Sequence, residues 1–81
     1  MTKTAKSYID SLDYTEFSKI RPLKDSGDLY QFLAEPCKDP VVIATFAAQC
    51  KNFGIPETYT NSSEMLHYLV VAINSRVSGN A

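Results

Sequence analysis

A chain of 81 residues has room for one domain, and a domain of this size buries only about 60% of the surface that its unfolded chain exposes. The formal net charge of −1 gives no long-range field to attract nucleic acid or an acidic membrane surface. With three glycines, the chain has no phosphate-binding loop, dinucleotide-binding turn or nucleophile elbow. These limits predict a single helical domain over residues 1–81 that is not an enzyme and for which nucleic-acid binding is disfavoured.

The charged residues are concentrated in the N-terminal half of the chain. Residues 1–39 carry thirteen of the seventeen, and residues 40–81 carry only Lys51, Glu57, Glu64 and Arg76. Charged side chains are rarely buried unless they are paired, so the charge-poor half is the candidate core. We predict that the first half partly covers it.

Residues 4–20 place apolar side chains among charged ones at helical spacing, which predicts an amphipathic segment. Asp13 and Glu16 have the spacing of a capping box, so the segment holds either one helix or two short ones. Arg21-Pro22 predicts the end of this segment, because a proline disfavours the helical conformation of the residue before it. A further short helix is predicted over residues 28–35, with Ser26 as its cap.

The clearest helix is predicted over residues 40–53. The Asp39 side chain can accept hydrogen bonds from the first turn, and Pro40 suits the first helical position because its missing N–H needs no partner there. Gly54 suits the left-handed conformation that follows many helices, and Pro56 prevents continuation. One broad face of this helix is apolar and contains Val42, Ile43, Phe46, Ala47 and Cys50.

A second apolar helix is predicted over residues 61–77. Asn61 and Glu64 have the spacing of a capping box, with Asn in place of the usual Ser or Thr. Its apolar stripe contains Leu66, Leu69, Val70, Ile73 and Val77, and is widened by Met65, Tyr68 and Ala72. A helix that is apolar nearly all round is buried or contacts several neighbours.

The connection between these two helices, residues 54–60, is short enough for an antiparallel pair. We therefore predict an all-α fold, a small compact bundle of three to five helices, with a central antiparallel hairpin of about residues 40–53 and 61–77. The longest apolar stretch, residues 41–48, is far shorter than the ~20 residues that span a bilayer. No secretory signal pattern follows Lys3 and Lys6, so a cytoplasmic protein without membrane contact is expected.

Cys37 and Cys50 are predicted to be free thiols. If residues 40–52 are helical, the two lie on the order of 15 Å or more apart, well beyond the Cα separation of about 7 Å that a disulfide allows. We expect Cys50 in the core and Cys37 exposed in a loop. Two cysteines and one histidine, His67, are too few for a zinc site, so no metal and no cofactor are expected.

The remaining polar candidates are assigned structural roles. His67 lacks an oriented acidic partner and is expected to be satisfied by its neighbours or by water. The carboxylate pairs Asp10/Asp13 and Asp25/Asp28 are three residues apart and could share a helix face or a turn. Catalysis by such pairs requires a concave site around them, so we assign them to solvated faces and caps.

One short motif suggests a different function. Asp10-Ser11-Leu12 is similar to the phosphopantetheine attachment site of acyl carrier proteins, and Phe53-Gly54-Ile55-Pro56-Glu57, followed by Met65, Tyr68 and Leu69, looks like the end of such a carrier. The resemblance implies that Ser11 opens a helix and carries the thiol arm. The chain departs from the family because only ten residues precede Ser11, because about forty separate the two matches, and because it is nearly neutral.

The aromatic residues complete the sequence-based interpretation. Phe32, Phe46, Phe53 and Tyr68 have places in apolar stripes, whereas four tyrosines fall nearer polar positions, namely Tyr8, Tyr14, Tyr30 and Tyr59. Tyrosine is favoured at protein interfaces because it combines a rigid apolar body with a polar tip. The predicted function is a small protein–protein interaction module of regulatory, adaptor or inhibitor type, binding another protein or itself as a homodimer. An acyl-carrier-like protein using Ser11 and a small helical DNA-binding module are the alternatives.

Overall fold

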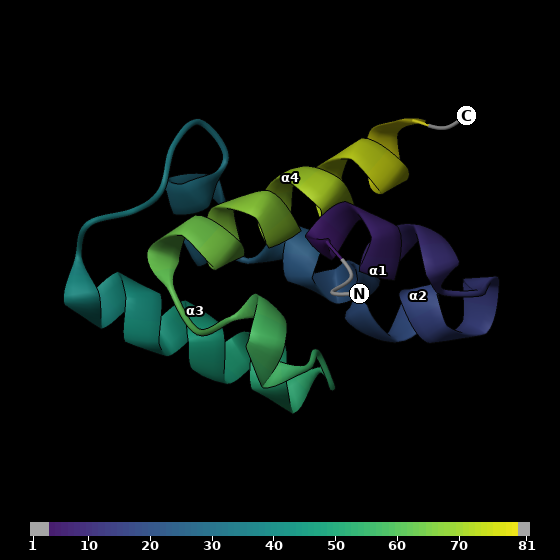
Figure 1. The fold of residues 1–81 in the computed structure, drawn as a ribbon, viewed down its shortest axis with the longest axis horizontal. Coiled ribbons are helices and arrows are strands. Elements are labelled where there is room, and N and C mark those ends of the chain that lie inside the picture. The colour runs from purple at the N-terminus through teal and green to yellow at the C-terminus, as the bar shows by residue number, and fades with distance from the viewer. Residues whose placement is uncertain (1–3, 80–81) are drawn as a thin grey trace.

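The computed structural model describes residues 4–79, and within this range the protein is helical and has no strand. Its four α-helices are α1 (Ala5–Ser11), α2 (Tyr14–Ile20), α3 (Pro40–Asn52) and α4 (Ser63–Gly79). Three short 3-10 helices complete it: η1 (Arg21–Asp25), η2 (Gly27–Phe32) and η3 (Glu57–Tyr59). The predicted all-α class and the compact helical bundle are confirmed (Figure 1).

The amphipathic segment at the start of the chain forms two helices because it contains two caps. The Thr4 side chain accepts a hydrogen bond from the Ser7 amide and starts α1. Leu12 is extended and ends it. Asp13 then forms the predicted capping box, in which its side chain accepts from the Glu16 amide and the Glu16 side chain accepts from the Asp13 amide.

The next segment differs from expectation in its helix type. Helical structure was predicted to end at Arg21-Pro22, but the chain continues directly into η1, with Pro22 at a first-turn position where no amide hydrogen is needed. Ser26 is a cap, as predicted, and its hydroxyl accepts from the Asp28 amide. The helix that it caps is the 3-10 helix η2, which ends at Phe32 and does not extend to residue 35.

The ends of α3 follow the sequence signals. The Asp39 side chain accepts from the Val41 amide, and Pro40 is the first helical residue. Gly54 follows the last turn with a φ of 88°, the left-handed conformation expected of it. The cap of α4 differs from the prediction: Ser62, not Asn61, accepts from the Met65 amide through its hydroxyl and from the Leu66 amide through its carbonyl.

The helix α4 is the central element, but its main neighbour is not α3. It packs most extensively against α1 and also contacts η1, η2 and η3, whereas α3 packs chiefly on η2. In Figure 1 the connection after α3 turns back along that helix, so α3 and α4 both start on the left. The predicted central antiparallel hairpin is therefore wrong in its pairing, because the return connection lets α1 and η2 take the places beside α4.

The core is built from both halves of the chain. Phe32 and Phe46 are fully buried and stack with ring centroids 5.1 Å apart, which joins η2 to α3. The face of α4 toward the core carries Leu66, Leu69, Val70 and Ile73, all with no exposed surface. The charge-rich half supplies Ala5, Ile9, Phe17, Ile20, Leu23, Leu29 and Phe32 to the same cluster. The N-terminal half therefore covers α4 and also contributes to the core itself.

Polar contacts fix the connections between these elements. Ser26 donates to the Gln49 side chain at 2.8 Å, and the Gln49 amide donates to Asp28 at 3.1 Å, which ties the start of η2 to α3. The Ser63 hydroxyl donates to the main-chain carbonyl of Cys37 and holds the loop before α3 against the start of α4. Across residues 4–79, no helix has both the length and the apolar content needed to cross a membrane.

Candidate functional site

The described residues form an apolar groove between the first turn of α1 and the exposed side of α4. We call it the α1/α4 groove. It is half-open to solvent and has a volume of about 660 Å³. Its lining residues are Thr4, Ala5, Lys6, Met65, Tyr68, Val71, Ala72 and Ser75. A volume of this size lies within the range of sites that hold a ligand or a side-chain anchor of a partner.

The groove exists because α4 is longer than the helix that covers it. At 1.5 Å per residue, the 17 residues of α4 extend about 25 Å and the seven residues of α1 only about 10 Å. On the α4 wall of the groove, Tyr68 is 58% exposed and Val71 is 42% exposed, one turn apart. We call this pair the α4 ridge. Two large apolar side chains at helical spacing on the wall of the groove are therefore exposed to solvent.

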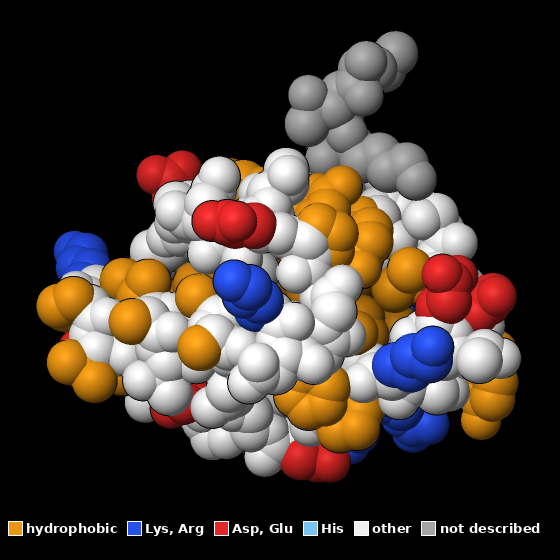
Figure 2. Space-filling view, turned by 90° about the horizontal axis from the view of Figure 1, so that it is seen from below, with side chains coloured by type: hydrophobic (Ala, Val, Ile, Leu, Met, Phe, Trp, Pro, Cys, Tyr) orange, Lys and Arg blue, Asp and Glu red, His pale blue; other side chains and the backbone are white. Residues whose placement is uncertain are grey.

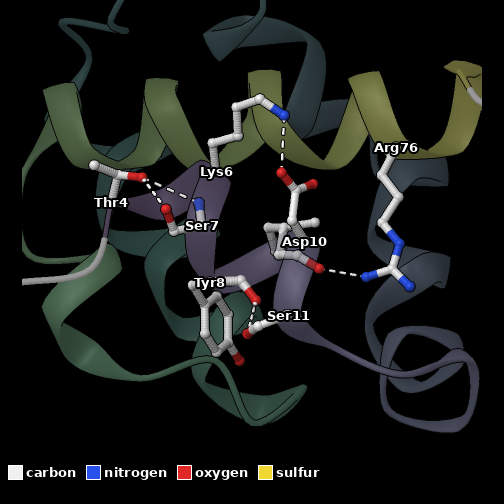
Figure 3. A network of polar contacts seen from close by, with 8 residues as sticks. Thr4, Lys6, Ser7, Tyr8, Asp10, Ser11 and Arg76 are labelled. Carbon is white, nitrogen blue, oxygen red and sulfur yellow. Dashed lines mark hydrogen bonds and ion pairs between the residues drawn. The ribbon is translucent and has the colours of Figure 1, made fainter.

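The charged residue that lines the groove is already paired. Lys6 and Asp10 form an ion pair at 2.9 Å one turn apart on α1, and Figure 3 shows both side chains along the side of α1 that faces α4. Both are well exposed, so the pair contributes little to stability. Together, Lys6 and Asp10 add no net charge to this edge of the groove.

The four tyrosines predicted to bind a partner have different environments. Tyr14 is 79% exposed at the start of α2, and Tyr30 is 62% exposed in η2. Tyr59 is buried, and Tyr8 is half-buried with its ring stacked on that of Tyr59 at 4.7 Å between centroids. Burial, followed by the proximity of Tyr59 and Glu16, raises the pKa of the Tyr8 phenol above its usual value. None of the four lines the α1/α4 groove.

Sequence reasoning missed the residues that do form this surface. Tyr68 was given a place in an apolar stripe and not in a partner-binding surface, and Val71 was not singled out, yet both side chains are exposed. The available signal was the circumference of α4, which carries more apolar side chains than one buried face holds. Tyr68 and Val71 lie on the side of α4 away from Leu66 and Ile73, and α1 is too short to cover them.

Ser11 lacks the setting that a carrier protein gives its attachment serine. It is the last residue of α1, not the first residue of a helix, and its hydroxyl donates to the carbonyl of Tyr8 at 2.8 Å (Figure 3). The side chain is exposed. The local geometry is that of a helix C-terminus, which departs from the pattern that the resemblance implies.

The candidate catalytic groups make structural contacts. His67 is half-buried on α4, and its Nδ1 lies 2.6 Å from the carbonyl of Phe32, which accepts the hydrogen bond when that nitrogen carries the proton. The four paired carboxylates each contact a neighbour: Asp10 pairs with Lys6, Asp13 caps α2, Asp25 pairs with Lys24, and Asp28 accepts from Gln49. Among the described residues, no group of three or more metal-binding side chains lies together.

Both cysteines are free thiols, and both are buried. This agrees with the prediction for Cys50. Burial raises the pKa of this thiol from 9.0 to about 12. The expected exposure of Cys37 is wrong, because the hydrogen bond from Ser63 to its carbonyl holds this loop against α4.

The surface charges are dispersed on the face that Figure 2 shows. Lys and Arg side chains there stand apart from one another, with Asp and Glu side chains between them. Nucleic-acid binding surfaces concentrate cations along one stripe or patch. This face has no such patch, and its orange apolar side chains are interspersed with the charges.

Comparison with models of protein families, with curated proteins and with solved structures finds no match for this chain.

Proposed function

We propose that this protein is a small non-enzymatic interaction module that binds another protein through the α1/α4 groove and the α4 ridge. The observation that carries the proposal is the exposure of Tyr68 and Val71 on the wall of a groove that is lined by further apolar side chains. A small domain benefits from burying such residues, and a contiguous apolar surface beside a groove is typical of interaction sites.

The composition of the surface supports this type of function. Tyrosine and methionine are enriched at interfaces, and both types line the groove, as Tyr68 and Met65. Among the described lining residues the charged side chain is that of Lys6, and it is paired with Asp10, so desolvating it does not bury an unpaired charge. The proposal places the module in the cytoplasm, where thiols such as those of Cys37 and Cys50 stay reduced.

A capture experiment with matched baits tests the proposal. Val71→Glu places a charge in the groove, and Val41→Glu places the same charge on an exposed valine at the start of α3, outside the groove. We expect the wild-type and Val41→Glu baits to retain the same protein from native lysate in similar amounts. The Val71→Glu bait should retain at least tenfold less of it. Untagged copies of this chain are counted as captured protein, like any other. If all three baits retain equal amounts of every captured protein, the proposal is overturned.

A further inference from the structure

We propose that residues 33–37, which link η2 to α3, form a strap that α4 holds closed and that opens on its own, carrying the Cys37 side chain out of the core. We call this segment the η2–α3 strap. Its basis is that two side chains of α4 hold the main chain at the two ends of the segment. The strap lies outside the α1/α4 groove, so this device is additional to the proposed interaction function.

The two side chains that hold the strap lie one turn apart on α4. The Ser63 hydroxyl donates to the carbonyl of Cys37, the last residue of the strap. The Nδ1 atom of His67 lies 2.6 Å from the carbonyl of Phe32, the residue before the strap. A carbonyl oxygen only accepts, so this nitrogen carries the proton. Residues four apart share a helix face, so one short stretch of α4 fixes both ends of the strap.

The strap depends on these side chains because its main chain has few other partners. Residues 34–38 lie in neither a helix nor a strand, and no described residue forms a main-chain to main-chain hydrogen bond with them. Ala34 and Glu35 are exposed, Leu33 is half-buried, and Cys37 is buried. Segments with few buried apolar contacts open locally, at a lower free energy than the whole domain.

The two cysteines report on two kinds of opening. Cys37 lies on the strap and lines a surface pocket that Gln31 of η2 also lines, whereas Cys50 lies in α3 with no exposed surface. Opening of the strap frees Cys37 alone, and Cys50 is freed when α3 leaves the core. Each cysteine is followed by a lysine, Lys38 or Lys51, so the two thiols have similar neighbours once they are exposed. A difference between their labelling rates therefore measures a difference in opening.

Alkylation of the full chain with iodoacetamide tests the strap. Trypsin cleaves between the two cysteines at Lys38, so peptide mass spectrometry follows each thiol separately. In the wild type, we expect Cys37 to be labelled at least about tenfold faster than Cys50, because local opening is more frequent than global unfolding. Arg76→Ala destabilises the other end of α4, so it should raise the Cys50 rate and leave the Cys37 rate within about twofold of the wild type.

Variants of the two donors test what holds the strap. Ser63→Ala and His67→Phe each remove one donor, and each should raise the Cys37 rate about tenfold because the open strap has already lost that hydrogen bond. Ser63→Thr retains a hydroxyl and should leave the Cys37 rate close to that of the wild type. Circular dichroism establishes that each variant is folded. Nitrogen NMR of His67 should find the proton of the neutral ring on Nδ1.

Three results would overturn the strap. The first is equal labelling of the two cysteines in the wild type, with both rates raised alike by Arg76→Ala, because Cys37 would then be freed only by global unfolding. The second is a Cys37 rate that Ser63→Ala leaves unchanged. The third is a neutral His67 ring with its proton on Nε2, because Nδ1 would then have no hydrogen to donate to Phe32. If His67→Phe does not fold, the serine variants and the NMR measurement still decide between these outcomes.

Discussion

The guanidinium of Arg76 donates a hydrogen bond to the main-chain carbonyl of Ile9, which lies 67 positions earlier in the chain (Figure 3). The same group lies over the Phe17 ring, with its central carbon 4.3 Å from the ring centroid. One side chain of α4 therefore contacts the last turn of α1 and the body of α2. A cation at a helix C-terminus is also favoured by the helix dipole.

Replacing Arg76 should loosen this end of the bundle. Arg76→Ala removes a charge-assisted hydrogen bond and a cation–π contact, and we expect the free energy of unfolding to fall by about 2 kcal/mol. Urea denaturation followed by circular dichroism measures the change. Arg21→Ala removes an exposed arginine and should change stability by about 0.5 kcal/mol or less. Equal losses in the two variants would show that the contacts of Arg76 contribute nothing specific.

Gly54, which follows α3, and Gly27, the first residue of η2, provide a matched pair of substitutions. Gly54 has a φ of 88°, and a Cβ added there meets no atom within 4 Å, so Gly54→Ala tests backbone conformation alone. We expect it to reduce the free energy of unfolding by about 1–2 kcal/mol. Gly27 also has open space but no positive φ, and Gly27→Ala should be neutral or stabilise by up to about 1 kcal/mol. Thermal unfolding of both variants measures these changes in stability. A Gly54→Ala protein as stable as the wild type would contradict the left-handed conformation of Gly54.

The stacked pair Phe32 and Phe46 should be the most sensitive part of the core. Phe46 has no exposed surface, and Phe46→Ala should cost about 3–5 kcal/mol, a large part of the stability of a small domain. Phe53→Ala, which removes an exposed phenylalanine just after the same helix, should cost about 1 kcal/mol or less. Denaturant midpoints give both values. If Phe46→Ala does not fold, Phe46→Leu provides the smaller and still measurable loss.

Alkaline pH should destabilise the fold through Cys50. Burial raises the pKa of this thiol from 9.0 to about 12, so above pH 9 the unfolded chain releases a proton that the folded chain retains. The contribution of the Cys50 thiol to the free energy of unfolding is fully present below pH 9 and is lost as the pH rises toward 12. At pH 10.5 the loss is about 2 kcal/mol. Other groups titrate in this range, so the measurement is the difference between the wild type and Cys50→Ala. A pH dependence that is the same in both proteins would remove Cys50 as its source.

Local sequence signals predicted helix boundaries better than helix pairing. Asp39-Pro40, Gly54 and the Asp13–Glu16 capping box act within a few residues, and the structure contains each of them. The cap of α4 was misplaced by one residue, because Asn61 and Ser62 both suit that position and only the backbone decides between them.

Pairing and exposure depend on contacts that spacing does not encode. The apolar circumference of α4 indicated a buried helix but not which of its neighbours would cover each side. The short α1 proved to be the main neighbour and left Tyr68 exposed, while Tyr59 in η3 was buried against Tyr8. The sequence therefore indicated that tyrosines bind a partner at the surface. Of the four that it selected, Tyr59 is buried, and Tyr68, the exposed tyrosine of the groove, was not among them.

The position of α4 has a consequence for biosynthesis. Ile9 and Ala5 are buried mainly because α1 packs against α4, a helix that the ribosome produces more than fifty residues later. Until residues 63–79 have emerged, α1 lacks its main packing partner, and the nascent chain is open to chaperones and proteases. The packing of α1 on α4 therefore forms late, and it brings together the first and last helices of the described chain.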